Sequence, residues 1–512
     1  MAGLKDADDF RDGEHFKGGG LLKFLLLGGG VLFAIIFIVL AATGGAEQEG
    51  GYSRSGAMAY SWLFAIVFFL TLSIGGIFWT LLHHASNSGW GIVVRRMMEN
   101  IGTMVLFVLI LGIPLVTVPT FKEALWEWIP LKAALDEKVD ARYEEGAVAK
   151  LKGEYEAGQK TAQSEFDAFK AQNVADQAKA RPGAKMALSD QLAKQEADLA
   201  KVTEHDLSEG ALKEEIAKEV YLDHHDGNYM LWKKRGYLNE GAWTFRFVLY
   251  FIALVGIIYA LRFWSVKNDK DGDPKWFLLQ RKWACGFLPF FATAWTFLVF
   301  DWLMALDYTW FSTMWGVYLF AGSALNSMAL LILVVTVLMK AGYLKKVVTP
   351  EHYLLMGRLL FAFTVFWGYI AFSQFFLIWY ANITEETRFY LQRNADFWNT
   401  YTILALVVGH FFIPFLMLLI QQAKKNLTYI CTASAWILCM HVLDIYWIII
   451  PERGPSLTDG GMMTIPGAIY YDVIAFLAVG GIFGFFFLWR LGTASLFPCR
   501  DPRLDESLNV VN

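Results

Sequence analysis

The chain has 512 residues, of which 56% are hydrophobic and 18% charged, and its mean hydropathy of +0.39 is too high for an ordinary soluble protein. A formal net charge of −4 gives no basic field for a polyanion, so nucleic acid is not an expected partner. The four cysteines form no CxxC or CxxCH motif, which argues against covalent c-type haem and a cysteine-ligated iron–sulfur cluster.

Apolar runs of about twenty residues, the length that crosses a ~30 Å hydrocarbon core, recur along the chain. They predict ten transmembrane helices at about 21–43, 59–84, 101–120, 243–264, 283–304, 314–338, 355–380, 400–421, 427–450 and 468–491. The first run is longer than the apolar core of a signal peptide and leads into a polar loop, so we expect a retained helix. The fold class is therefore an all-α integral membrane protein, with spans 1–3 in residues 21–120 and spans 4–10 in residues 243–491.

A charged insertion at residues 121–242 separates spans 3 and 4. Between 131 and 240, 39 of the 110 residues are Asp, Glu, Lys or Arg. Apolar residues recur there at helical spacing, and Arg181-Pro182-Gly183 would break a helix, so we predict a hairpin of two amphipathic helices at about 136–180 and 185–222. We expect the hairpin to contact a partner; the alternative is a solvated, partly disordered loop.

Lysine and arginine are distributed unequally between the two sides. The segment 1–20, the loops after spans 2, 4, 6 and 8, and the tail 492–512, counted together with Lys23, Arg262 and Arg490 at the adjoining span ends, hold 20 of them, whereas the opposite short loops hold 4. The positive-inside rule then places both termini in the cytoplasm and the insertion outside, which in a bacterium is the periplasm.

Charged side chains within apolar spans usually face the interior of a bundle and have a task. His441 and Asp444 are three residues apart, so on a helix they share one face and could exchange a proton. Asp301, Asp307 and Asp472 are candidates to join them in a proton relay that opens outward. The alternative for these three aspartates is that they cap helix ends at the membrane surface.

His410 is a further candidate for the proton relay, and the remaining histidines and arginines are candidates at the inner surface. We place His410 near the middle of the bilayer and His441 in its outer half, so no histidine pair suits a b-type haem, and a hydrogen bond to a neighbouring helix would explain His410. An inner-surface group could hold a lipid headgroup, a carboxylate or a quinone carbonyl, although anchoring explains its arginines equally well. That group consists of His83, His84, Arg95, Arg96 and Glu99. No metal site is predicted.

Several longer stretches resemble the NrfD-like, or PsrC-like, membrane subunits, and most narrowly the ActF-type subunits of bacterial alternative complex III, a quinol:cytochrome c oxidoreductase. The main stretch is VFDWLMALDYTWFSTMWGVYLFAGS at 299–323. The others are HHASNSGWGIVVRRMMENI at 83–101, KKRGYLNEGAWTFRFVLYF at 233–251, FSQFFLIWYANITEETRFYLQR at 372–393, HFFIPFLML at 410–418 and HVLDIYWIIIP at 441–451.

This resemblance implies two four-helix bundles with two peripheral helices. It implies as partners an ActC-like sister subunit, multihaem and monohaem cytochrome c subunits and an iron–sulfur protein, with a terminal oxidase as a further candidate. Those partners would carry the redox centres, so this chain would hold no covalent cofactor, and quinone or quinol and lipids are its candidate ligands. Carried over to this sequence, the implied polar positions are Asp301, Asp307, His441 and Asp444, with His83 and Arg95 on the inner side.

Three functions follow as hypotheses. The first is a membrane subunit that takes part in quinol binding or proton transfer within a respiratory complex. The second is a purely structural assembly subunit. The third is an independent ion or solute transporter, which would be isolated without cytochrome or iron–sulfur partners.

Overall fold

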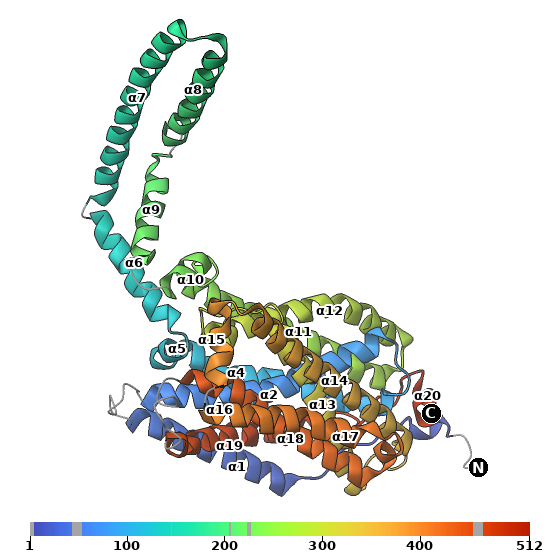
Figure 1. Cartoon of the computed structure of the whole chain (residues 1–512). Coiled ribbons are helices and arrows are strands. Elements are labelled where there is room, and N and C mark those ends of the chain that lie inside the picture. The colour runs from blue at the N-terminus through green and yellow to red at the C-terminus, as the bar shows by residue number, and fades with distance from the viewer. Residues whose placement is uncertain are drawn as a thin grey trace. The chain divides into compact units, whose positions relative to one another are not determined.

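The computed structural model describes residues 5–43, 54–144, 146–203, 206–222, 227–394, 396–453 and 464–511. Within these ranges the chain is helical, and an isolated bridge between His15 and Ser495 is the one β-type pairing. It divides into two compact units, residues 1–127 with 240–512 (unit 1) and residues 128–239 (unit 2), whose helices are labelled in Figure 1.

Unit 1 contains the following helices in chain order. They are η1 Ala7–Phe10, α1 Gly20–Thr43, α2 Arg54–Ala85, α3 Ile92–Thr103, α4 Val105–Thr117, α5 Pro119–Leu125, α11 Glu240–Asp271, α12 Pro274–Trp302, η2 Met304–Leu306, α13 Trp315–Lys340, α14 Pro350–Ala381, α15 Thr384–Arg393, α16 Asp396–Tyr401, the π-helix η3 Thr402–Phe412, α17 Ile413–Leu419, η4 Gln422–Lys425, α18 Leu427–Ile449, η5 Ile450–Arg453, α19 Thr464–Leu491 and α20 Leu504–Leu508.

Ten helical segments of the described residues are long and apolar enough to cross a membrane, which confirms the predicted number of spans. They are Gly20–Ala42, Ser55–Ala85, Ile92–Thr117, Glu240–Asp271, Pro274–Leu306, Trp315–Lys340, Pro350–Ala381, Trp398–Leu419, Leu427–Arg453 and Ile469–Leu491. Most run several residues past the predicted bounds, because helices continue into the polar surface layers where hydropathy gives no signal. The chain is thus a multi-pass membrane protein.

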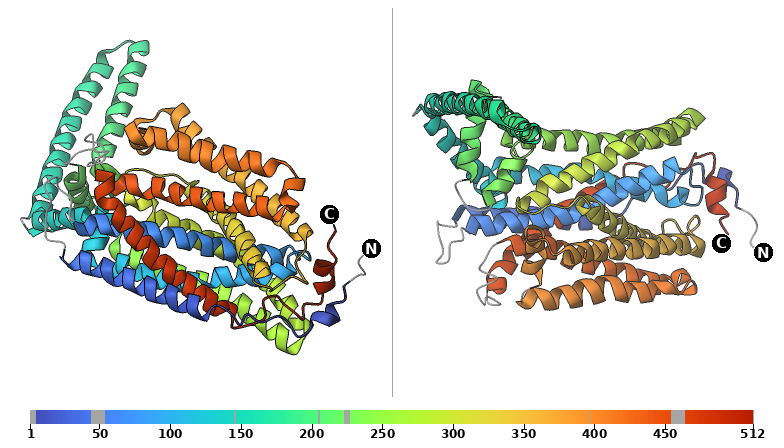
Figure 2. Two further views of the ribbon diagram at one scale, coloured as in Figure 1. Left: turned by 90° about the horizontal axis from the view of Figure 1, so that it is seen from below. Right: turned by 45° about the horizontal axis from the view of Figure 1, so that its top comes forward.

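Helix α2 forms the core of unit 1. Most of its apolar window is buried (89%), against 11% for α1. Helix α2 packs against α3, α12, α13 and α19, while α13 packs against α14 and α18, and α11 against α12. Helix α1 lies along α19, as both views of Figure 2 show. Their backbones touch at Gly30 and Gly481: a Cβ on Gly30 would lie 2.8 Å from the Ile482 amide nitrogen.

Both termini lie at the same end of unit 1, called here the termini end (Figure 1). The Lys5 amide donates to Asn509 Oδ1 at 2.9 Å, and the Leu496 amide donates to the Glu14 carbonyl oxygen at 2.7 Å. Helices α2 and α13 end here, whereas α12 ends at the opposite end. An even number of spans returns the chain to its starting side, so this arrangement agrees with the ten spans.

Unit 2 is helical but is divided more finely than predicted. Its helices are α6 Trp128–Glu144, α7 Ala147–Lys179, α8 Pro182–Thr203, α9 Glu209–Leu222 and α10 Gly227–Lys234. The predicted break at Pro182 is present, and Asn173 of α7 donates to the Leu188 carbonyl oxygen of α8 at 2.9 Å. The expectation of one helix over 136–180 was wrong, because Gly146 has a left-handed φ of 75° that ends α6. The second predicted helix, 185–222, is likewise divided between α8 and α9.

Candidate functional site

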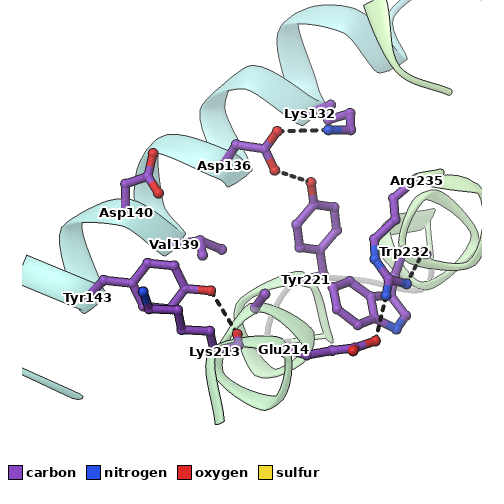
Figure 3. Close-up of a pocket in the computed structure, with 11 residues that line it drawn as sticks. Lys132, Asp136, Val139, Asp140, Tyr143, Lys213, Glu214, Tyr221, Trp232 and Arg235 are labelled. Atoms are coloured by element: carbon purple, nitrogen blue, oxygen red, sulfur yellow. Dashed lines mark hydrogen bonds and ion pairs between the residues drawn. The ribbon is translucent and has the colours of Figure 1, made fainter. Parts of the chain in front are cut away.

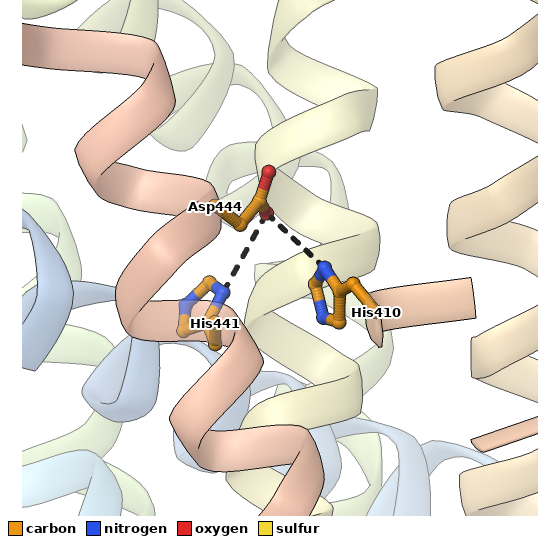
Figure 4. A group of neighbouring side chains, drawn as sticks. All are labelled: His410, His441 and Asp444. Atoms are coloured by element: carbon orange, nitrogen blue, oxygen red, sulfur yellow. Dashed lines mark ion pairs between the residues drawn. The ribbon is translucent and has the colours of Figure 1, made fainter. Parts of the chain in front are cut away.

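Three titratable side chains come together inside unit 1, as Figure 4 shows. His441 and Asp444 lie one turn apart on α18, and His410 projects from η3. Their Nδ1 atoms lie 3.7 Å (His441) and 3.9 Å (His410) from Asp444 Oδ2. Both imidazoles are fully buried and Asp444 is 1% exposed. A carboxylate between two imidazoles in an apolar interior is a set of groups that can hold and exchange a proton.

Neighbouring helices orient this cluster. Tyr318 of α13 donates to Asp444 Oδ1 at 2.5 Å, which leaves Oδ2 facing the two histidines. Thr71 Oγ1 of α2 lies 2.8 Å from His441 Nε2. The Trp367 ring of α14 packs on His410 with 4.0 Å between ring centroids. Helices α2, α13, α14, α18 and η3 therefore all contribute to one site.

Within the described part of the chain, three imidazole nitrogens of the cluster donate or accept no hydrogen bond. They are Nδ1 and Nε2 of His410 and Nδ1 of His441. The interpretation of His410 as satisfied by a neighbouring helix was therefore wrong. Buried polar atoms without partners are costly and are found where a site exchanges protons or holds a ligand or water.

The depth assigned to these histidines also needs correction. Their ring centroids lie 6.2 Å apart, so they form a pair at one depth rather than lying at different depths. Spans Trp398–Leu419 and Leu427–Arg453 are joined by a short turn and run in opposite directions. His410 lies as many residues after the first residue of its span, Trp398, as His441 lies before the last residue of its span, Arg453. Because the two spans are antiparallel, this places the two rings side by side.

The cluster also has the composition of a cation site, since its ligand atoms all lie within 4.8 Å of one another. Ligands of a tetrahedral zinc ion at ~2.1 Å would be separated by roughly 3.4 Å. The separations of 3.7 and 3.9 Å are wider than that. The geometry therefore fits proton exchange among the three groups better than direct coordination of one ion.

The outer aspartates do not join this cluster through the contacts of the described residues. Asp301 accepts two hydrogen bonds from Arg246, at 2.8 and 2.9 Å, and one from Tyr250 at 2.7 Å. Asp307 accepts from the amide and hydroxyl of Thr309. The predicted single outward cluster is thus divided, and these two carboxylates hold local structure.

Asp472 has its own partners as well. It accepts a hydrogen bond from Ser61 at 2.6 Å, from Tyr446 at 3.2 Å, and it pairs with Arg453. The contact joins α2, α18 and α19 close to the ends of those helices. Asp472 therefore serves as a link between helices.

Most of the inner-surface candidates are paired within the chain. Arg95 Nη2 lies 2.7 Å from Asp501 of the carboxyl tail, and Glu99 accepts from Ser265 at 2.7 Å. His83 Nδ1 lies 2.8 Å from the Trp79 carbonyl oxygen, whereas neither ring nitrogen of His84 has a hydrogen-bond partner in the described residues. Arg95 thus already pairs with a carboxylate of its own chain through Nη2, and a role for it toward an external ligand stays a prediction.

Several residues that contact the candidate site residues were missed from the sequence. Thr71 and Tyr318 lie in apolar stretches where one hydroxyl gives no pattern, so their role depends on helix packing. Arg246 and Arg262 had a visible signal, because an arginine inside an apolar span needs a partner. Arg246 pairs with Asp301, and a search for intramembrane arginines would have indicated that pair.

Unit 2 contains an open cleft of about 560 Å³ between α6, α9 and α10 (Figure 3). Asp136 pairs with Lys132 at 2.8 Å and accepts from the Tyr221 hydroxyl at 2.6 Å, and Arg235 pairs with Glu214 at 2.7 Å. Burial and the hydrogen bond to Asp136 raise the pKa of Tyr221. Most charges of the cleft are therefore neutralised within unit 2, and a partner for this unit stays a prediction.

In comparisons with known proteins, no protein-family model and no curated protein matches this chain.

Proposed function

We propose that this chain is a membrane subunit of a quinol-oxidising respiratory complex of the alternative complex III type, and that its His410, His441 and Asp444 cluster transfers protons. The observation that carries the proposal is the meeting of these three side chains in the buried interior of a ten-span membrane protein. Ionisable groups at such a position are costly, and proton relays are a common reason for them.

The resemblance to NrfD-like subunits supplies the rest of the proposal. In the proposed arrangement, spans 2–5 and 6–9 form two four-helix bundles, and spans 1 and 10 lie at the periphery. The pairings of α2 with α3 and α12, of α13 with α14 and α18, and of α1 with α19 support this arrangement. The subunit would lie in a bacterial cytoplasmic (inner) membrane with both termini in the cytoplasm and unit 2 in the periplasm. An ActC-like sister, cytochrome c subunits and an iron–sulfur protein would be its partners.

The chemistry assigns a role to each atom. Oxidation of a quinol releases two protons with its two electrons, and these must leave the apolar interior. His410 Nδ1 and His441 Nδ1 would each exchange a proton with Asp444 Oδ2. The separations of 3.7 and 3.9 Å exceed hydrogen-bond length, so a small side-chain rotation or one bridging water would complete each transfer. Tyr318 and Thr71 would keep the carboxylate and His441 in place.

Buried polar side chains continue from the cluster toward the termini end. Helix α13 carries Ser323, Asn326 and Ser327, and α2 carries Thr80 before His83. All of these lie on helices that pack against each other. They provide hydroxyl and amide groups along which bound water could extend a proton path.

A purely structural subunit is the second candidate. The observation that favours it is the complete pairing of Asp301 and Asp472 with arginines, which gives these carboxylates a packing role. Under that hypothesis the substitution Asp444→Asn would leave turnover intact.

The test uses the complex isolated from its native membrane. We expect Asp444→Asn and His410→Gln to lower quinol turnover at least tenfold, a common loss for a missing proton-transfer group, with the subunits still assembled. His352→Gln is the matched control, because His352 is also buried but has partners on both ring nitrogens. Wild-type turnover in an assembled Asp444→Asn complex would contradict the proton role, and isolation of the native chain without redox partners would contradict the complex.

A further inference from the structure

Two arginines converge at the termini end of unit 1. Arg262 of α11 donates from Nη2 to Thr493 Oγ1 at 3.0 Å, and Thr493 donates in turn to the Arg490 carbonyl oxygen at 2.7 Å. The Arg490 guanidinium lies over the ring of Tyr259, with 4.9 Å from its Cζ to the ring centroid. Tyr259 precedes Arg262 by one helical turn, so both guanidinium groups border the same patch of α11 and α19.

The arginines around Glu99 outnumber the carboxylates that they contact. Arg95 pairs with Asp501, and Arg96 pairs with Asp269. Glu99 is shared by three arginines, with the Arg262 contact at 3.8 Å. In the described ranges no carboxylate lies within ion-pair distance of Arg490, so four guanidinium groups face three carboxylates.

The two arginines also retain unused hydrogen-bond donors. Arg490 Nε is buried and donates no hydrogen bond to any residue that the structure describes, and Arg262 Nη1, which lies 3.8 Å from Glu99 Oε2, is beyond hydrogen-bond distance of that carboxylate. Arg262 as a whole is 3% exposed. A buried N–H group without an acceptor is costly, and a phosphate oxygen is a strong acceptor for guanidinium groups.

The side chains beside these arginines are apolar and exposed. Phe263 follows Arg262 and is 60% exposed, while Trp489 precedes Arg490 and is 46% exposed. Tryptophan at this position in a membrane helix is typical of the level of the lipid headgroups. A ligand that covered this patch would therefore combine an anionic group with apolar chains.

We propose that Arg262 and Arg490 bind the phosphate group of an anionic phospholipid at the membrane surface on the side of the termini. Basic pockets between transmembrane helices commonly hold such headgroups. Inorganic phosphate shares the anionic chemistry, but it would not use the exposed Phe263 and Trp489. The site is separate from the proposed proton cluster and does not depend on it.

The experiment measures lipid binding to the full chain, or to its native complex, after delipidation in a neutral detergent. Native mass spectrometry would follow titration with phosphatidylglycerol, phosphatidylcholine and inorganic phosphate. We expect phosphatidylglycerol to bind more tightly than phosphatidylcholine. Arg490→Gln and Arg262→Gln should each weaken phosphatidylglycerol binding about fivefold or more, the effect of removing one cation near a membrane surface.

Arg281→Gln is the control, because Arg281 is an exposed cation near the start of α12 at the same end, and its loss should leave binding unchanged. If Arg262→Gln does not fold, Arg262→Lys keeps the charge but removes the planar donor group and should give a smaller loss. Equal binding of both lipids, or equal effects of Arg490→Gln and Arg281→Gln, would overturn the proposal. Saturation of the site by inorganic phosphate, with no added affinity for the lipid, would overturn its lipid identity.

Discussion

The Asp301 and Arg246 pair should be among the strongest polar contacts in unit 1. Arg246 donates twice to the carboxylate, Asp301 is 1% exposed and the Arg246 side chain 17%. Arg246→Gln would remove the cation from a buried carboxylate that also accepts a hydrogen bond from Tyr250, and breaking a buried pair from one side costs ~3–5 kcal/mol. Asp301→Asn should cost less, about 1–2 kcal/mol, because the partly exposed guanidinium can turn toward water.

The measurement is the free energy of unfolding in mixed micelles, followed by circular dichroism as SDS is added. Lys122 and Glu240 form a matched control pair, since they also join α11 to another helix, here α5, but the Glu240 side chain is 53% exposed. Lys122→Gln should cost no more than about 1 kcal/mol. The reasoning is refuted if Arg246→Gln is no more destabilising than Lys122→Gln, or if Asp301→Asn is the worse of the two substitutions in the buried pair.

Two further predictions concern a helix contact and a thiol. Gly75→Ala should destabilise the protein by about 1–3 kcal/mol in a thermal unfolding assay, because its Cβ would overlap the Ser323 carbonyl oxygen of α13. Gly28→Ala is the control and should cause no loss, because a Cβ there would have no neighbour within 4 Å. Equal melting temperatures of the two variants would count against this packing. Burial, and then the nearby Asp269, raise the pKa of Cys499 to about 11, so the folded state favours the neutral thiol. Any resulting stabilisation is present below the ordinary thiol pKa and is lost as the pH rises through about 11. Alkylation at pH 8 should be about a hundredfold slower than for an unperturbed thiol and should rise toward pH 11, and a rate equal to that of the SDS-unfolded chain would be inconsistent with the burial.

The span count was predictable because hydrocarbon tolerates few polar groups, and ten apolar stretches of sufficient length have few alternatives. The helices of the charged insertion were less predictable. Pro182 marked one break, whereas Gly146 tolerates both helical and left-handed geometry, so its residue type alone did not indicate the break. Composition thus predicts where the membrane helices lie more reliably than where a polar helix ends.

The candidate site was predictable only in part. The interval of three between His441 and Asp444 indicated their shared face, which follows from helix geometry alone. His410 was placed at another depth than His441. The depth of a residue depends on where its span begins and ends, and the span ends at Trp398 and Arg453 lie outside the predicted runs 400–421 and 427–450. Tyr318 and Thr71 come from other helices, so their contacts with the pair follow from tertiary packing that one sequence does not reveal.

The most direct test of the proton cluster is the protonation of Asp444 itself during turnover. Infrared difference spectra of the native complex, recorded between its oxidised and quinol-reduced states, report carboxyl groups through their C=O stretching bands. We predict a carboxyl band that shifts in D₂O and is missing from the Asp444→Asn complex. An identical set of carboxyl bands in wild type and Asp444→Asn would contradict the assignment of proton transfer to this cluster.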